Sequence, residues 1–266
     1  MNLKELENEE IENGYGSANA SSKVCQDIIL KAISSSRLSR NVTIKGGVVM
    51  RSKTNDVRRA TQDMDIDFIR YSLEDNAIDS FIDQLNVLND IRIKRIGEIS
   101  ELKQQDYHGK RVLVEIEDNL GNKITSKIDL GVHNRLNIAQ EEFCFDIAFD
   151  ENGASLLCNS NEQMLTEKLK SLLKFGPVST RFKDIFDIYY LIKHVNGGKL
   201  LTCFKEYIFD DKKMYENTIQ DIISRLESVS ENSFYMTKLN SSRQKWIDVN
   251  ADTVFDEIKK YFKSLI

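Results

Sequence analysis

The sequence has few of the residues that cross-link or interrupt a fold: its 266 residues include four cysteines and one proline. The cysteines lie far apart and form no CxxC pair, which argues against a disulfide framework and against a thiolate zinc site. We expect all of them to be reduced and to lie in or near the core. They are Cys25, Cys144, Cys158 and Cys203.

Long apolar runs are also missing. No stretch of about 18 apolar residues occurs, and the acidic N-terminus MNLKELENEEIENG lacks the apolar segment of a signal peptide. We therefore expect no membrane span and no signal peptide, and a cytoplasmic protein. The net charge of −5 gives no general sign of nucleic-acid binding, although local basic clusters could still contact phosphates. The histidines, His108, His133 and His194, show no ligand spacing.

Enough apolar residues are present, 41% of the chain, to bury a substantial core. The first half mixes short strand-like runs with helices, and the second half reads as helix after helix. This pattern predicts an α+β protein: a mixed sheet flanked by helices over residues 1–155, followed by an all-helical region over residues 156–266. A composition shift near residues 150–160 marks the border.

The expected elements follow from hydrophobic periodicity and from turn residues. The predicted strands are 42–45, an aspartate strand at 63–68, 91–96, 111–118, 123–130 and 142–147. The predicted helices are 17–36, a short helix opening at Gly46-Gly47, 76–88, 161–174, 182–192 and three more within 200–266. Asn119, Leu120, Gly121 and Asn122 form a hairpin signal between two of the strands, because glycine and asparagine tolerate positive φ.

The segment from Lys45 to Phe68 is the most informative part of the chain, because three aspartates occupy alternate positions in it. Successive side chains of a strand point to opposite faces, so Asp63, Asp65 and Asp67 would share one face. Their neighbours Met64, Ile66 and Phe68 would share the other. Carboxylates crowded in this way are costly unless a cation or a strong donor neutralises them, which is the first sign of a metal site.

A site for phosphoryl or nucleotidyl transfer needs carboxylates to hold Mg²⁺ and donors to hold phosphates. Aspartates two apart on a strand have Cα atoms roughly 6.6 Å apart, a spacing that lets their side chains converge on metal ions. Gly46 and Gly47, at a strand-to-helix turn, would expose backbone N–H groups to a phosphate. A later strand carries Asp129, which would face the same side as the earlier acids and could help to activate a hydroxyl nucleophile.

Other interpretations of these residues stay open. A double glycine alone is weak evidence for phosphate binding. The aspartates also match the first, third and fifth positions of a calcium loop, with Glu74 at the twelfth, but Phe68 stands where that loop requires glycine. A solvated acidic strand without a ligand is a third interpretation.

The motifs GG…R…RATQDMD, KIDLG, TEKLKSL and RFKDIFDIYYL occur in this order over about residues 40–195. The series resembles the AbiEii/AbiGii nucleotidyltransferase toxin family, whose catalytic domain belongs to the DNA polymerase β-type superfamily. The resemblance implies that residues 1–155 are the nucleotidyltransferase domain, and that the helical domain completes its active-site cleft.

The resemblance also implies roles for individual residues. Thr61, Asp63 and Asp65 fit the family's first motif, with Asp67 as an additional acid, although Asp65 and Asp67 could be the metal pair instead. Asp129 and Gly131 fit the second motif, Lys168 the third as a triphosphate contact, and Asp184 and Asp187 the fourth, where they could orient Lys168 or Arg181. The sequence departs from the family at Lys183, where arginine is usual, and at Val48, where a hydroxyl residue commonly follows the glycines.

Three arginines, Arg51, Arg58 and Arg59, surround the first motif. They could bind a triphosphate or an RNA backbone, Arg51 being the candidate for the nucleotide, or they could simply offset the aspartates.

The expected activity is a Mg²⁺-dependent transfer of a nucleotide from a nucleoside triphosphate, with release of pyrophosphate. The resemblance implies a toxin of a type IV-like toxin–antitoxin or abortive-infection pair, with an RNA such as tRNA or a protein as acceptor and a cognate AbiEi-type antitoxin as partner. Two rivals remain. One is an inactive protein of the same fold that acts through an antitoxin or nucleic-acid partner, and the other is a metal-dependent nuclease.

Overall fold

A computed structural model describes residues 1–102 and 109–266, and the chain divides into two compact units, Met1–Asn159 and Ser160–Ile266. The first unit holds a sheet with helices, and the second is helical, so the expected α+β class is confirmed. The division falls a few residues beyond the expected border. The reason is β7 (Asp150–Cys158), a strand that the sequence did not lead us to expect.

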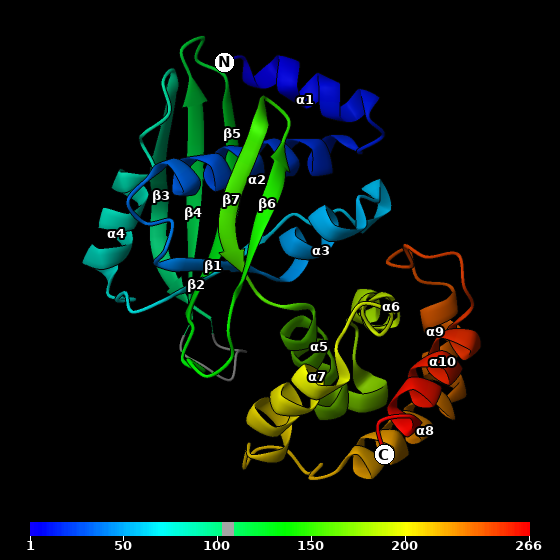
Figure 1. Cartoon of the computed structure of the whole chain (residues 1–266). Helices are drawn as coiled ribbons and strands as arrows, with labels where there is room; N and C mark the ends of the chain where they lie inside the picture. Colours follow the sequence, from blue (N-terminus) through cyan, green and yellow to red (C-terminus); the bar gives the residue numbers. More distant parts are fainter. Residues whose placement is uncertain (103–108) are drawn as a thin grey trace. The chain divides into compact units, whose positions relative to one another are not determined.

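The first unit is built on a seven-stranded mixed sheet with the order β3-β4-β5-β2-β1-β7-β6 (Figure 1). Its other strands are β1 (Val42–Lys45), β2 (Met64–Phe68), β3 (Ile91–Glu101), β4 (Lys110–Asp118), β5 (Lys123–Val132) and β6 (Glu141–Ile147). The central strand β2 pairs with β5 in parallel and with β1 in antiparallel orientation, while β1 pairs with β7 in parallel. The sheet thus places the two strands with the candidate acids, β2 and β5, side by side.

The predicted alternation along β2 is confirmed on its apolar side. Met64, Ile66 and Phe68 are fully buried, as are Ile128 and Leu130 of β5. The segment is therefore a strand, and the calcium-loop interpretation is wrong.

Four α-helices accompany the sheet: α1 (Leu3–Glu12), α2 (Ser17–Ser35), α3 (Gly46–Thr54) and α4 (Asp75–Gln84), with a 3₁₀ turn, η1, at Val57–Arg59. Helix α2 contacts β5, β6 and β7, and α4 contacts β3 and places Phe81 against Phe68 with ring centroids 5.0 Å apart. Helix α1 was not predicted, because its acidic sequence offers little apolar surface. It packs on α2 through Leu3 and Leu6.

The second unit contains α5 (Asn161–Phe175), α6 (Phe182–Leu191), α7 (Gly197–Phe204), α8 (Ile219–Ser230), α9 (Ser233–Asn240) and α10 (Ala251–Lys263). A 3₁₀ turn, η2 (Gly176–Val178), lies between α5 and α6, and a π-helical turn, η3 (Lys205–Phe209), follows α7. Four α-helices thus follow α6 where we expected three. Ser160 caps α5 by accepting a hydrogen bond from the Gln163 backbone. Within residues 1–102 and 109–266, no helix has the length and apolar character needed to cross a membrane.

The cysteines are free thiols. Cys25, Cys158 and Cys203 are buried as expected, and burial raises the pKa of the Cys158 thiol to about 11. Cys144 departs from the expectation, because its position on β6 leaves it exposed.

Asp118 ties the N-terminal helix to the β4–β5 hairpin. Its buried carboxylate accepts hydrogen bonds from the Leu3, Leu120 and Asn122 backbone N–H groups and from the Asn122 side chain. Burial alone would raise the pKa of Asp118, but these hydrogen bonds outweigh it and lower the pKa to about 2.

We expect Asp118→Asn to lower the free energy of unfolding by about 1–3 kcal/mol at pH 7, because charge-assisted hydrogen bonds are lost. A carboxylate with a depressed pKa stabilises the fold fully above its ordinary pKa, and this stabilisation is lost as the pH falls toward 2. Urea unfolding of both proteins from pH 7 downward checks this. The prediction is wrong if the difference between them fails to shrink below about pH 4.

Candidate active site

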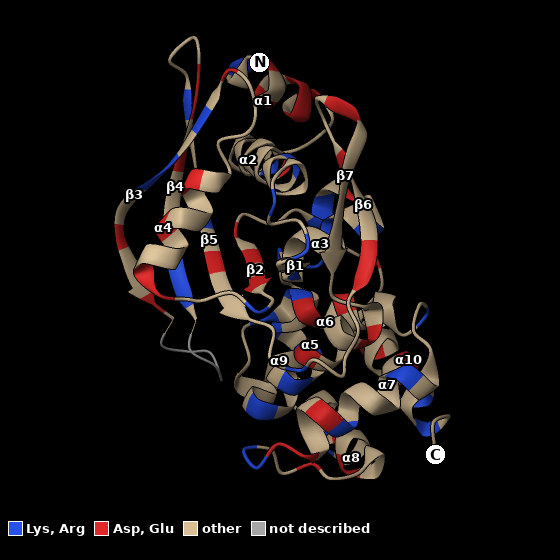
Figure 2. Ribbon diagram, turned by 60° about the vertical axis from the view of Figure 1, so that its left-hand side comes forward, with Lys and Arg blue, Asp and Glu red and all other residues tan. Residues whose placement is uncertain are grey.

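The candidate site is built on a row of charged residues that crosses four neighbouring strands. Lys45 of β1 is the Cα partner of Asp65 of β2, Asp65 is the partner of Asp129 of β5, and Asp129 is the partner of Arg111 of β4. Figure 2 shows the acidic residues on the adjacent strands β2 and β5. Neighbouring strands lie about 5 Å apart, so the two carboxylates are forced close together between two cations.

Asp129 forms a bidentate ion pair with Arg111. The guanidinium Nε and Nη2 atoms lie 2.6 and 2.8 Å from the two carboxylate oxygens, and the Asp129 side chain is largely buried. The hydrogen bonds from Arg111 to Asp129 raise the pKa of the Arg111 guanidinium. The pair fixes the orientation of the Asp129 carboxylate.

Asp67 has a different partner on the same face of β2. Its carboxylate lies 2.7 Å from the Lys45 ammonium, and both side chains are more than 90% buried. The sequence left open whether Asp63 and Asp65 or Asp65 and Asp67 bind the metal ion. A metal ion bound by Asp67 would have to compete with the buried ion pair between Asp67 and Lys45.

Asp65 lies between these two pairs, and its ionised form is disfavoured. Desolvation is the main reason that the pKa of Asp65 rises to about 6, and the neighbouring charges of Asp129, Asp67 and Asp63 add to the rise, while Lys45 opposes it. Surplus negative charge at this position would be relieved by a bound cation.

The two glycines pack directly against the first motif. A Cβ atom on Gly46, whose φ is +66°, would lie 2.2 Å from the Asp65 Oδ2 atom, and a Cβ atom on Gly47 would lie 2.4 Å from the Thr61 Oγ1 atom. Only glycine leaves room for these two side chains. Helix α3 begins at Gly46, and no side chain caps it by accepting a hydrogen bond from its first turn. The backbone N–H groups of this turn lie near Asp65.

Asp63 directly precedes β2 and is partly exposed. Among the described residues, no group of three or more His, Cys, Asp or Glu side chains is arranged to hold a metal ion. The ion pairs of Asp129 with Arg111 and of Asp67 with Lys45 explain this, since they turn carboxylate oxygens toward cations. His108 lies outside the described residues.

Arg51, the candidate contact for the nucleotide, is paired with residues of α2. Its guanidinium is buried, donates to the Gln26 Oε1 atom at 2.6 Å and pairs with Asp27 at 3.3 Å. Of the other two arginines, Arg58 is exposed and pairs with Asp56 in its own turn, and Arg59 is buried.

The helical unit gathers the third and fourth motifs into one buried cluster. The Lys168 ammonium lies 2.9 Å from Asp184 and 2.7 Å from Asp187, so both acids orient it. Arg181 donates to Asp184 at 2.6 Å, and the Trp246 indole donates to Asp187 at 3.0 Å. Burial alone would raise the pKa of Asp184, but the charges of Lys168 and Arg181 outweigh it and lower the pKa.

Sequence reasoning missed Lys45, Arg111 and Gln26. Only an approximate signal existed for Arg111: counting outward from the Asn119–Asn122 turn pairs position 111 with position 130, whereas the observed β4–β5 register pairs it with position 129. No comparable signal exists for Gln26, because its contacts join segments that are far apart in the sequence.

The chain is similar to one known protein family and to several solved structures. A family model described as "Nucleotidyl transferase AbiEii toxin, Type IV TA system" matches residues 28–263. Among solved structures, an antigenic nucleotidyltransferase-like protein from Paracoccidioides brasiliensis aligns with a TM-score of 0.49 and 17% identity, covering 89% of this chain and 97% of the other. The antibiotic-resistance factor ANT(2'')-Ia aligns with a TM-score of 0.43 and 14% identity, covering 70% and 90%. No curated protein matches.

We expect Asp65→Asn to stabilise the metal-free protein by about 1–2 kcal/mol at pH 8, because it removes a carboxylate whose ionisation is disfavoured in the folded state. As the pH falls from about 6 to 4, the folded wild type takes up a proton that the unfolded chain does not, so the advantage of the variant shrinks. Urea unfolding in chelator checks this. Exposed Asp146 on β6 provides the control: Asp146→Asn should change stability little.

We expect Gly47→Ala to destabilise the protein by about 1–3 kcal/mol, although alanine favours helices over glycine, because the new methyl group overlaps Thr61. Gly198→Ala is the matched control, since Gly198 is also the second residue of a helix, α7, and a Cβ there meets nothing closer than 3.4 Å. Thermal unfolding of both variants measures the difference. Equal melting temperatures would show that Thr61 moves aside without cost.

Proposed function

Because the chain belongs to the AbiEii family of nucleotidyltransferase toxins of type IV toxin–antitoxin systems, and is thus a nucleotidyltransferase, we propose the following reaction. A nucleotide is transferred from a nucleoside triphosphate, with Mg²⁺ as cofactor, to a hydroxyl group of an RNA such as tRNA or of a protein. Pyrophosphate is released.

The observation that carries the proposal is the pairing of Asp65 with Asp129 on neighbouring strands, beside the uncapped start of α3. Carboxylates and backbone N–H groups are thereby brought to one place. These are the two kinds of group that a triphosphate and its metal ion require.

Two features support a magnesium ion as part of this proposal. Asp65 carries surplus negative charge, and oxygen ligands are those that Mg²⁺ prefers. Asp63 and Asp65 would hold the ion, with Asp129 completing the cluster. The ion pair of Asp67 with Lys45 supports this choice over the alternative pair of Asp65 and Asp67. When bound, the ion would neutralise charge on the phosphates and orient them.

The protein's own groups position the reactants. The acceptor oxygen forms a bond to the α-phosphorus as the bond from that phosphorus to the β-phosphate oxygen breaks, and pyrophosphate leaves. The acceptor hydroxyl loses a proton, for which Asp129 is the proposed base. The N–H groups at Gly46 and Gly47 contact phosphate oxygens, and Lys168 is the proposed cationic contact of the triphosphate.

Family membership also supports a cognate antitoxin as partner. A role in abortive infection and action in the cytoplasm are further parts of the proposal.

We expect the wild type, incubated with each labelled triphosphate, Mg²⁺ and total RNA or a protein pool, to transfer label and release pyrophosphate. Asp65→Ala should lower the rate at least about 100-fold, because it removes a carboxylate from the proposed metal site. Asp146→Asn, an exposed acid of the same sheet, is the matched control and should keep the wild-type rate.

Other outcomes would contradict the proposal in distinct ways. Equal transfer by wild type and Asp65→Ala would remove Asp65 from the mechanism. Fragmented RNA without pyrophosphate would identify a nuclease. An absence of both transfer and metal-dependent nucleotide binding by calorimetry would indicate a binding protein that has lost catalysis.

A further inference from the structure

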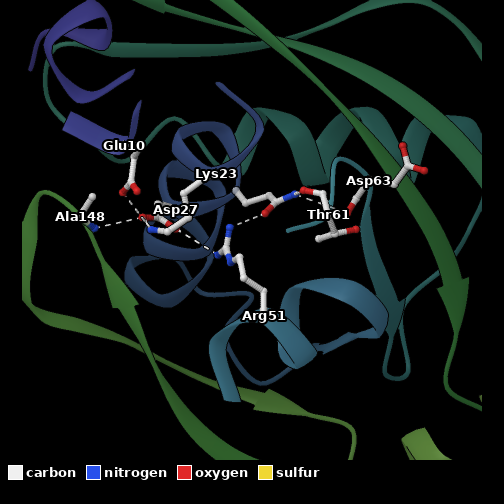
Figure 3. Close-up of polar contacts among 8 residues, drawn as sticks. Glu10, Lys23, Asp27, Arg51, Thr61, Asp63 and Ala148 are labelled. Atoms are coloured by element: carbon white, nitrogen blue, oxygen red, sulfur yellow. Dashed lines mark hydrogen bonds and ion pairs between the residues drawn. The ribbon is translucent and has the colours of Figure 1, made fainter. Parts of the chain in front are cut away.

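A buried chain of polar side chains runs from the N-terminal helix to the first motif (Figure 3). Glu10 of α1 pairs with Lys23 of α2, Lys23 with Asp27, and Asp27 with Arg51 of α3. Two acidic side chains alternate with two basic ones, so the charges within this network cancel. Nothing in the proposed reaction uses these residues.

Gln26 is the last member of the chain and the one that reaches the candidate site. It is fully buried, and its Nε2 atom donates to the Thr61 carbonyl oxygen at 3.0 Å and lies 3.5 Å from the Asp63 carbonyl oxygen. Its Oε1 atom accepts from Arg51 at 2.6 Å. This is the only assignment of the amide that satisfies all partners, because Arg51 can only donate and the carbonyls can only accept.

The other side chains of this network hold Arg51 in a position from which it can orient Gln26. Arg51 and Asp27 are each at most 3% exposed. Asp27 also accepts a hydrogen bond from the Ala148 backbone at 3.0 Å, which joins the turn between β6 and β7 to the same network. Gln26 therefore has little freedom to move.

The segment that Gln26 contacts has no regular structure of its own. Residues 61–63 lie between η1 and β2 and belong to neither. In Figure 3 the Asp63 carboxylate points away from Arg51 and Asp27, so the backbone is held from one side while the acid projects to the other. Gly47 packs against the Thr61 side chain.

We propose that Gln26 is a positioning residue: its amide fixes the backbone of residues 61–63 and thereby sets where the Asp63 carboxylate stands relative to Asp65. The functional part of this inference rests on the proposed nucleotidyl transfer, whereas the structural part does not. A misplacement of about 1 Å in a catalytic group can lower a rate by about 100-fold, so a rigid support for Asp63 matters for catalysis.

Gln26→Glu tests the proposal sharply. A glutamate still accepts from Arg51, so the buried arginine keeps a partner and the fold is retained. The group facing the Thr61 carbonyl, however, changes from a donor to a negatively charged acceptor, which repels it. We expect kcat for nucleotidyl transfer to fall about 10–100-fold, with a smaller change in KM for the triphosphate.

Tryptic cleavage gives a second readout that needs no activity. Arg59 is 2% exposed and lies next to the segment, so release of residues 61–63 should speed cleavage after Arg59 about 10-fold in Gln26→Glu. Asn86→Ala is the control, because it removes two hydrogen bonds with the Ile93 backbone and touches no member of this network; it should leave kcat unchanged and speed cleavage after Arg59 much less than Gln26→Glu does.

Unchanged cleavage in Gln26→Glu would overturn the positioning role. Faster cleavage with unchanged kcat would overturn its link to catalysis. If the wild type transfers no nucleotide at all, the proposed function fails, and cleavage after Arg59 alone decides whether Gln26 positions the segment.

Discussion

The repulsion between carboxylates on adjacent strands is the constraint on which the rest of this structure depends. Sheet register places Asp65 beside Asp129, and a sheet cannot separate them without breaking its hydrogen bonds. The fold offsets the repulsion at both ends of the row, with Arg111 on Asp129 and Lys45 on Asp67. Asp65 is left with a pKa of about 6, because desolvation and the neighbouring carboxylates disfavour its ionised form.

The segment that precedes β2 is held from two sides. Gly47 of α3 packs against the Thr61 side chain, and Gln26 of α2 binds its carbonyl oxygen. Both helices are fixed in turn by the Asp27–Arg51 pair between them. A buried pair of this kind adds little net stability but is costly to break, and it thus favours one arrangement of the helices over others.

In the helical unit, the family's third and fourth motifs form one cluster, in which Lys168 is shared by Asp184 and Asp187. The sequence left open which of the two acids matters, and the structure gives each a second partner, Arg181 for Asp184 and Trp246 for Asp187. Two carboxylates around one lysine restrict its rotamers.

The sequence by itself determined the fold class, most elements and the acidic face of β2, because period-two alternation and the turn at residues 119–122 are local signals. Helix α1 and strand β7 could not be predicted in this way, since acidic α1 offers little apolar surface and β7 (DENGASLLC) has no regular apolar alternation. Only the tertiary structure decided that Arg51 is buried with Asp27, that Asp67 is paired with Lys45, and that Gln26 supports the first motif. The physical reason is that a side chain's role follows from its nearest partners, and these lie on other elements of the sheet and its helices.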